Sequence, residues 1–296
     1  MKVVLAIDAS RGSQSLVEAA TSRPSPSGTR FIVLHVVNMA ALGRFAVMLD
    51  QEKKAGQTWV AVTAEKLACA GLDAGTDVLV GFPRKAITEY AKEWGADFIF
   101  VASHGQSAVA RFLLGSVAQA VLRTAPCSVE VVRSRLNGAW AKGNALKILL
   151  ATDGSECATA AVRSVMSRPW PSGSQTKIIS VAELVIPGSE VIASSSSPTY
   201  PISLLEQMWN DARERARDAV EQARKLLETA EMKTLQEESA LEGDPRFLLL
   251  EQAREWGADL IVLGSHGRRA IDRVLMGSVS EFVALHAQCS VEVIRG

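Results

Sequence analysis

The sequence lacks an excess of charge, a cysteine motif and a long apolar run. Its 32 lysines and arginines balance 32 aspartates and glutamates, so no global field favours nucleic acid or an anionic membrane surface. None of the four cysteines shows C-x-x-C spacing, which makes buried free thiols the default interpretation. No apolar run approaches the ~20 residues of a membrane span, and the run at 1–8 is too short for a signal sequence. We therefore expect a soluble, cytoplasmic protein that binds neither nucleic acid nor membranes.

Catalytic and metal-binding motifs are also missing. The chain has no G-x4-G-K-[ST] lysine loop, so the corresponding NTPase chemistry is not expected. His104 and His266 lie in tight glycine turns, where a side chain bonded to the local backbone is the favoured interpretation. His35 and His286 have no cysteine or carboxylate partner at metal spacing. We predict no catalytic residue, no metal site and no redox cofactor, and at most slow ATP hydrolysis.

What the sequence does contain is an internal repeat. Residues 101–117 match residues 263–279 position for position at an offset of 162, whereas Asp8 aligns with Asp153 at an offset of 145. The second copy thus has 17 additional residues between its second and third expected strands. The 296 residues therefore predict two domains, 1–134 and 145–296, joined by a linker at 135–144.

Each copy has the pattern of five strands alternating with four helices. The expected strands are 2–7, 29–37, 77–80, 97–101 and 128–133 in the first copy and 145–152, 175–182, 233–241, 259–263 and 290–295 in the second. This order predicts an α/β fold of two tandem, doubly wound, five-stranded and mainly parallel sheets, of the Rossmann-like type. A glutamate in the middle of each last strand, Glu130 or Glu292, indicates a sheet edge. Two such edges in one chain could pair with each other.

The connection at 183–201 holds the additional residues and is rich in serine and proline. A loop of this length is more often mobile, or a binding flap, than packed structure. The expected helix that follows, 202–231, alternates arginines with acids, which favours a solvated, ion-paired face over a nucleic-acid site.

The most informative stretch is 264–278, which lies between an expected strand and an expected helix. A glycine loop that leads into a helix presents free N–H groups and therefore forms an anion cradle, which Arg268 and Arg269 would strengthen. The alternative is a tight turn with an ordinary serine N-cap. In doubly wound sheets, ligands bind beyond the carboxyl ends of the strands, where Asp8 and Asp153 also lie. An acid and an anion cradle that face one cleft suit a nucleotide.

At these residues the chain resembles the universal stress protein family in its tandem two-domain form, an adenine-nucleotide alpha hydrolase-like fold. The family's nucleotide signature, G-x2-G-x9-G-[ST], is present in the second copy. The resemblance implies an ATP-type ligand, with or without Mg, with phosphates on the loop and the start of the helix, adenosine near the aspartate, and adenine beside the backbone after the second strand. The residues so implied are Asp153, Val181, Gly264, Gly267, Arg268, Gly277, Ser278 and Val279, and more weakly Asp8, Val36, Gly105, Gly115, Ser116 and Val117.

The two copies of the signature differ. Ala102 occupies the position of Gly264, and Gln106 and Ser107 replace the two arginines. A methyl group on backbone close to a ligand excludes or weakens that ligand, so we expect tighter binding in the second copy.

These features favour a cytoplasmic stress-response regulator that binds ATP, or a related adenine nucleotide, mainly in its C-terminal domain. Two alternatives remain: an interaction scaffold with vestigial sites, and a slow nucleotide hydrolase or transferase. The resemblance also implies dimer-like association. The two copies could supply it through their last strands, with further homo-oligomerisation open.

Overall fold

The computed structural model describes residues 1–8, 12–42, 48–103, 114–133, 144–184, 201–229, 236–268 and 276–296. The interdomain linker and the serine-rich connection lie mostly or wholly outside these ranges, so the predictions made for them are not addressed by the structure. Among the described residues, no helix is long and apolar enough to cross a membrane.

Ten strands form a single sheet in the order β3-β2-β1-β4-β5-β10-β9-β6-β7-β8. The strands of the first half are β1 (Lys2–Ile7), β2 (Arg30–Asn38), β3 (Asp73–Gly81), β4 (Phe98–Ala102) and β5 (Ser128–Val132). Those of the second half are β6 (Lys147–Ala151), β7 (Gln175–Ala182), β8 (Gln236–Glu242), β9 (Leu260–Gly264) and β10 (Ser290–Ile294). Within each half all pairings are parallel, which confirms the predicted doubly wound fold.

Most strand bounds agree with the prediction to within two residues, but two strands begin three or more residues away from the expected start. β3 begins at Asp73, before the expected start, because it pairs with β2 along its full length from Asp73 to Gly81. Cross-strand pairing thus overrides the weak strand propensity of its Asp and Gly residues. β8 begins at Gln236 rather than at 233.

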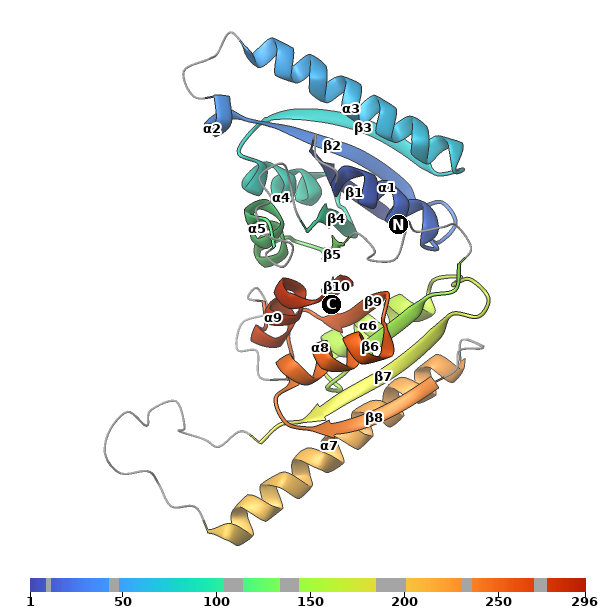
Figure 1. Ribbon diagram of the computed structural model, residues 1–296, viewed down its shortest axis with the longest axis vertical. Coiled ribbons are helices and arrows are strands. Elements are labelled where there is room, and N and C mark those ends of the chain that lie inside the picture. The colour runs from blue at the N-terminus through green and yellow to red at the C-terminus, as the bar shows by residue number, and fades with distance from the viewer. Residues whose placement is uncertain are drawn as a thin grey trace, which may run out of the picture.

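Helices cover both faces of the sheet and build two continuous cores (Figure 1). One face packs against α1 (Gly12–Ser22), α3 (Leu49–Cys69), α6 (Glu156–Met166) and α7 (Ile202–Thr229), and the other against α4 (Pro83–Trp94), α5 (Ser116–Thr124), α8 (Pro245–Trp256) and α9 (Ser278–His286). A short helix, α2 (Met39–Leu42), follows β2. α3 and α7 lie at opposite ends of the molecule, and the last strands lie at its centre.

The last strands of the two halves pair with each other, as predicted. β5 and β10 are antiparallel, and Glu130 lies directly opposite Glu292. The glutamates do not face solvent, however, because each half covers the edge of the other and both residues are 0% exposed. Each carboxylate is neutralised by a buried arginine of its own half: Arg23 pairs with Glu130, and Arg168 donates two 2.6 Å hydrogen bonds to Glu292. Buried carboxylates need such partners, since unpaired burial is very costly.

Two further arginines join the halves at the ends of helices. Arg133 Nη2 donates to the carbonyl oxygens of Ala284 (2.7 Å) and Leu285 (3.1 Å) in the last turn of α9. Arg295 Nη2 makes the matching contacts with Leu122 and with Arg123 in α5, at 3.3 and 3.2 Å. A cation at a helix C-terminus satisfies open carbonyls and favours the helix dipole. Each half thus stabilises the interface helix of the other.

The four cysteines are free thiols. Cys127 and Cys157 are buried and Cys289 is partly buried, as the sequence predicts, but Cys69 at the end of α3 is exposed. Burial raises the pKa of the Cys127 and Cys289 thiols to about 12.

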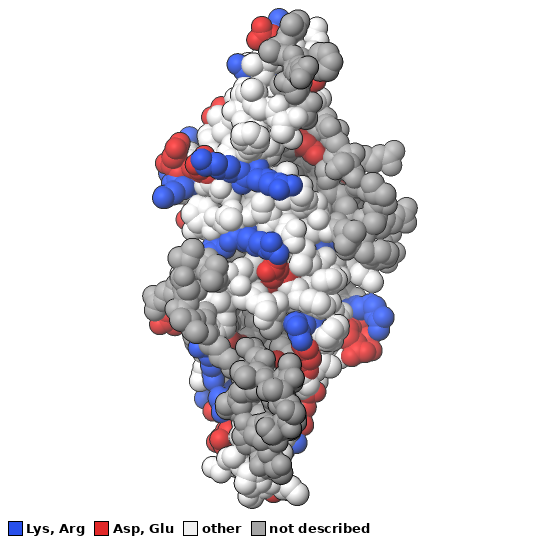
Figure 2. Space-filling model, turned by 90° about the vertical axis from the view of Figure 1, so that its left-hand side faces the viewer, with Lys and Arg blue, Asp and Glu red and all other residues white. Residues whose placement is uncertain are grey.

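Charge on the surface is mixed. On the face that Figure 2 shows, basic and acidic side chains lie in small neighbouring groups between uncharged residues. This distribution agrees with the balanced composition.

Candidate functional site

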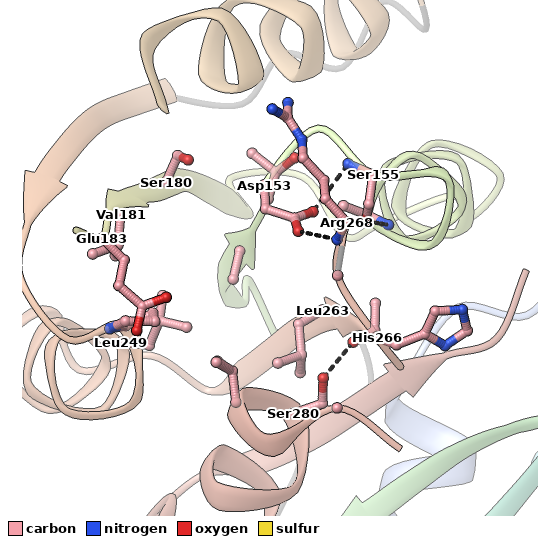
Figure 3. Close-up of a pocket in the computed structure, with 18 of the residues that line it drawn as sticks. Asp153, Ser155, Ser180, Val181, Glu183, Leu249, Leu263, His266, Arg268 and Ser280 are labelled. Atoms are coloured by element: carbon pink, nitrogen blue, oxygen red, sulfur yellow. Dashed lines mark hydrogen bonds between the residues drawn. The ribbon is translucent and has the colours of Figure 1, made fainter. Parts of the chain in front are cut away.

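A cavity of about 650 Å³ opens at the carboxyl ends of the strands in the second half (Figure 3). β6 lies between β9 and β7 in the sheet, so the strand order reverses at β6, where doubly wound sheets bind ligands. The cavity's volume is in the ordinary range for small-molecule sites.

All eight residues predicted for the second site line this one cavity. They are Asp153, Val181, Gly264, Gly267, Arg268, Gly277, Ser278 and Val279. Their counterparts in the first half lie at matching places in the fold: Asp8 after β1, Val36 in β2, and Gly115, Ser116 and Val117 at the start of α5. Gly105 lies outside the described residues.

Asp153 joins the two loops that form the floor of the cavity. Its Oδ1 accepts a hydrogen bond from the Ser155 amide (3.0 Å), and its Oδ2 accepts one from the Arg268 amide (3.1 Å). A Cβ atom at Gly267 would lie 2.5 Å from Oδ2. A side chain at this position would therefore displace the carboxylate from its hydrogen bond to the loop after β9.

The start of α9 provides open amide groups at the cavity. Gly277 is the N-cap residue and makes no side-chain cap, so the N–H groups of Ser278, Val279 and Ser280 are the first three of the helix. This geometry excludes the alternative of an ordinary serine N-cap. The loop is held closed by a hydrogen bond from the Gly277 amide to the Ser265 carbonyl (2.8 Å). Such a helix start is an anion-binding geometry.

Gly264 is required for a different reason from the one that the sequence suggested. A Cβ atom at this position would lie 2.7 Å from the carbonyl carbon of Cys157 and 2.8 Å from the amide of Ala158. The methyl group would thus meet the first turn of α6. In the first half Ala102 faces α1, where the sequence position that corresponds to Cys157 is Gly12. Relative to Gly264 and Cys157, the first half thus has the larger residue on the strand and the smaller one on the helix.

His266 bonds to side chains rather than to local backbone, contrary to the sequence-based expectation. Its Nδ1 lies 3.0 Å from Ser265 Oγ and its Nε2 lies 3.4 Å from Cys157 Sγ. The ring also lines the cavity. These contacts anchor the loop after β9 to α6. Among the described residues no group of three or more His, Cys, Asp or Glu side chains is arranged to hold a metal ion.

Several lining residues were not predicted from the sequence. Ser180 and Glu183 extend the wall beside Val181, Pro245 and Leu249 of α8 form an apolar side, and Ala212, Arg215 and Ala216 come from α7. The expected ion-paired surface of α7 is present for Arg213, which bonds to Glu242, and for Arg224, which bonds to Glu221. Arg215 lines the cavity instead and has no such pair with any residue that the structure describes. In the sequence, the side of α7 that faces the cavity could have been recognised from its alanines at 212, 216 and 219.

The corresponding space in the first half is filled differently. His35, which aligns with Ser180, is buried and contacts the Ile7 carbonyl through Nδ1 at 3.1 Å. Its ring packs edge-on against Trp59, 5.2 Å away, and a Cβ atom at Gly56 would lie 2.6 Å from its Cδ2. Aromatic rings therefore fill the space between β2 and α3. At the matching place in the second half, the small Ser180 side chain and α7 alanines leave a cavity.

Comparison with known proteins finds a family match in both halves. The pattern of the Universal stress protein family matches residues 1–133 and 145–295. Universal stress protein A homolog 2 of Coxiella burnetii is 51% identical over 53 residues, 18% of this chain and 36% of that protein. Universal stress protein YxiE of Bacillus subtilis is 28% identical over 154 residues, 50% of this chain and 98% of that protein. This chain thus matches only about a third of the first relative's length, and nearly all of the second.

A similarity of fold extends over the whole chain. The crystal structure of a universal stress protein from Archaeoglobus fulgidus covers 99% of this chain and 96% of its own, with a TM-score of 0.67 and 19% identity.

Proposed function

Because this chain belongs to the universal stress protein family, whose pattern matches both halves, we propose that it is a stress-response regulator that binds ATP or a related adenine nucleotide in the cavity of its second half. The observation that carries the proposal is the open start of α9, which shares one cavity with Asp153. An amide cradle favours phosphate, and a carboxylate accepts hydrogen bonds from ribose hydroxyls. These are the two ends of a nucleoside phosphate.

The walls of the cavity match the parts of such a ligand. The amide groups of Ser278 and Val279 would hold phosphate, and Asp153 would hold the ribose. The base would lie beside the Val181 backbone, against the apolar surface of Pro245 and Leu249. Apolar walls with a few placed polar groups are typical of small-molecule sites.

Helix α9 connects this cavity to the first half. α9 begins at the cavity, and its first turn carries Glu281, which pairs with Arg123 of α5. Its last turn is held by Arg133. A nucleotide that orders or shifts the start of α9 would therefore change contacts on the interface with the first half. This is the conformational change through which we expect the protein to regulate a partner.

The predicted asymmetry between the halves rests on side chains other than Ala102. The second half has Arg268 and a small Ser180 at its cavity, whereas the first has Gln106 at the position of Arg268 and the His35–Trp59 pair near the end of β2. We expect one nucleotide per chain at ligand concentrations that saturate the second site.

The test uses the full chain, because the two halves share a buried interface. Mass spectrometry of ligand released from denatured protein would identify an adenine nucleotide, and isothermal titration with ATP would give one site. Asp153→Ala should abolish this binding and the matched variant Asp8→Ala should preserve it. A protein that releases no nucleotide and does not bind ATP would refute the proposal, and equal losses in the two variants would refute the asymmetry.

A further inference from the structure

Arg215 is a cation of α7 that lines the cavity. Arg213, Arg224 and Lys225 form ion pairs with acidic side chains. Arg215 lines the cavity, is exposed, and makes no ion pair with any residue in the described part of the chain. An exposed arginine without a carboxylate partner at a cavity wall leaves its planar set of donors available to a ligand.

A second guanidinium lies close to the same face of α7. The Arg268 side chain extends past Asp153 in Figure 3 and lies against Gly154, next to the methyl group of Ala219. Ala219 is one helical turn beyond Arg215, on the same side of α7. Gly154 has a φ of +73°, and a side chain at this position would occupy the place of the guanidinium. Arg268 also makes no ion pair with a described residue.

The cavity therefore presents two cationic features to one ligand. The start of α9 supplies amide groups, α7 supplies Arg215, and the loop after β9 supplies Arg268, whose guanidinium lies near Ala219 of α7. The described acids of the lining are Asp153, which is bonded to two loop amides, and Glu183, which lies beyond Val181. The amides at a helix start hold about one phosphate group, so a ligand that also contacts the arginines must carry more phosphates.

We propose that Arg215, together with Arg268, binds the outer phosphates of the nucleotide and makes the site select polyphosphates over monophosphates. The inference rests on the proposed function and adds a ligand class to it. Arg215 lies outside the glycine signature, on the helix that follows the connection specific to the second half. The side chain that sets the phosphate count thus comes from a segment in which the two halves diverge.

The test compares Arg215→Gln with Arg217→Gln in the full chain. Arg217 is also exposed on α7 but does not line the cavity, so the control removes the same charge from the same helix. Isothermal titration at constant ionic strength would measure ATP, AMP and inorganic tripolyphosphate. We expect Arg215→Gln to weaken ATP and tripolyphosphate by roughly tenfold and AMP by about twofold or less, since charge-assisted bonds to phosphate are strong. Arg217→Gln should leave all three unchanged, and Arg215→Lys should recover part of the loss.

Equal weakening of ATP and AMP by Arg215→Gln, or an effect no larger than that of Arg217→Gln, would overturn the inference while the proposed function stands. Wild-type protein that binds neither ATP nor AMP would overturn both. Unchanged thermal unfolding of Arg215→Gln would show that the loss is one of binding rather than of fold.

Discussion

Glu292→Gln is the most informative perturbation of the interface between the halves. Glutamine has nearly the shape of glutamate but no charge, so the variant leaves the Arg168 guanidinium buried without its counterion. Glu292 is 0% exposed and receives two 2.6 Å hydrogen bonds from Arg168. Removal of one partner from such a buried pair costs about 3–5 kcal/mol of stability.

Two features place the expected loss at the lower end of that range. The change relieves repulsion between Glu292 and Glu130, which lie opposite each other in the β5–β10 pair. Arg168 also keeps a 2.7 Å hydrogen bond to Ser164 Oγ and lies 5.3 Å from the ring of Phe98 in the other half. A cation over an aromatic ring retains roughly 0.5–2 kcal/mol. We therefore expect the free energy of unfolding to fall by about 3 kcal/mol.

Urea denaturation at neutral pH, followed by circular dichroism, measures this loss. The matched control is Glu242→Gln, which breaks the exposed pair with Arg213 and should have little effect. The double variant Arg168→Met with Glu292→Leu replaces the ion pair with apolar side chains and should recover most of the stability. A loss in Glu292→Gln no larger than that in the control would refute the account of the interface as a neutralised charge cluster.

Two further predictions concern packing and thiol chemistry. Gly264→Ala should destabilise the protein by about 1–3 kcal/mol in thermal or urea unfolding, because the methyl group meets the backbone of α6 at Cys157 and Ala158. An unchanged unfolding free energy would contradict this prediction. Iodoacetamide at pH 8 should label Cys69 but not Cys127 or Cys289, because burial raises the pKa of the latter two thiols to about 12 and leaves little thiolate. Mass spectrometry measures the labelling, and rapid labelling of Cys127 or Cys289 in the folded protein would contradict this prediction. Ionisation of these two thiols is harder in the folded than in the unfolded chain, so their contribution to stability is lost as pH rises from about 9 towards 12.

The sequence predicts which candidate residues lie together where the backbone determines their positions. The glycines and Asp153 come together because parallel strands deliver their carboxyl ends to one edge of the sheet, which the order of apolar runs already indicates. The pairing of β5 with β10 was also predictable, because a glutamate at the centre of each of these strands indicates a sheet edge.

The features that the sequence did not predict depend on contacts between residues far apart in the chain. Arg23 and Arg168, each followed by proline, recur at the same place in both copies, and the sequence suggests only that the helix ends there. The structure shows that they neutralise Glu130 and Glu292. Arg215 was hidden for a different reason. The alternating arginines and acids of α7 suggest an ion-paired face, and Arg213 and Arg224 do pair with Glu242 and Glu228, but Arg215 lines the cavity.

The glycine that first distinguished the two halves, Gly264, thus packs against the backbone of α6. The difference in function that we propose instead depends on side chains that point towards the cleft: a buried His35–Trp59 pair in one half, and Arg215 and Arg268 beside small residues in the other. Duplication kept the sheet, the helix starts and the interface, since each half needs the other to cover its edge strand. The two halves therefore have the same architecture, and we expect the second to bind the polyphosphate nucleotide.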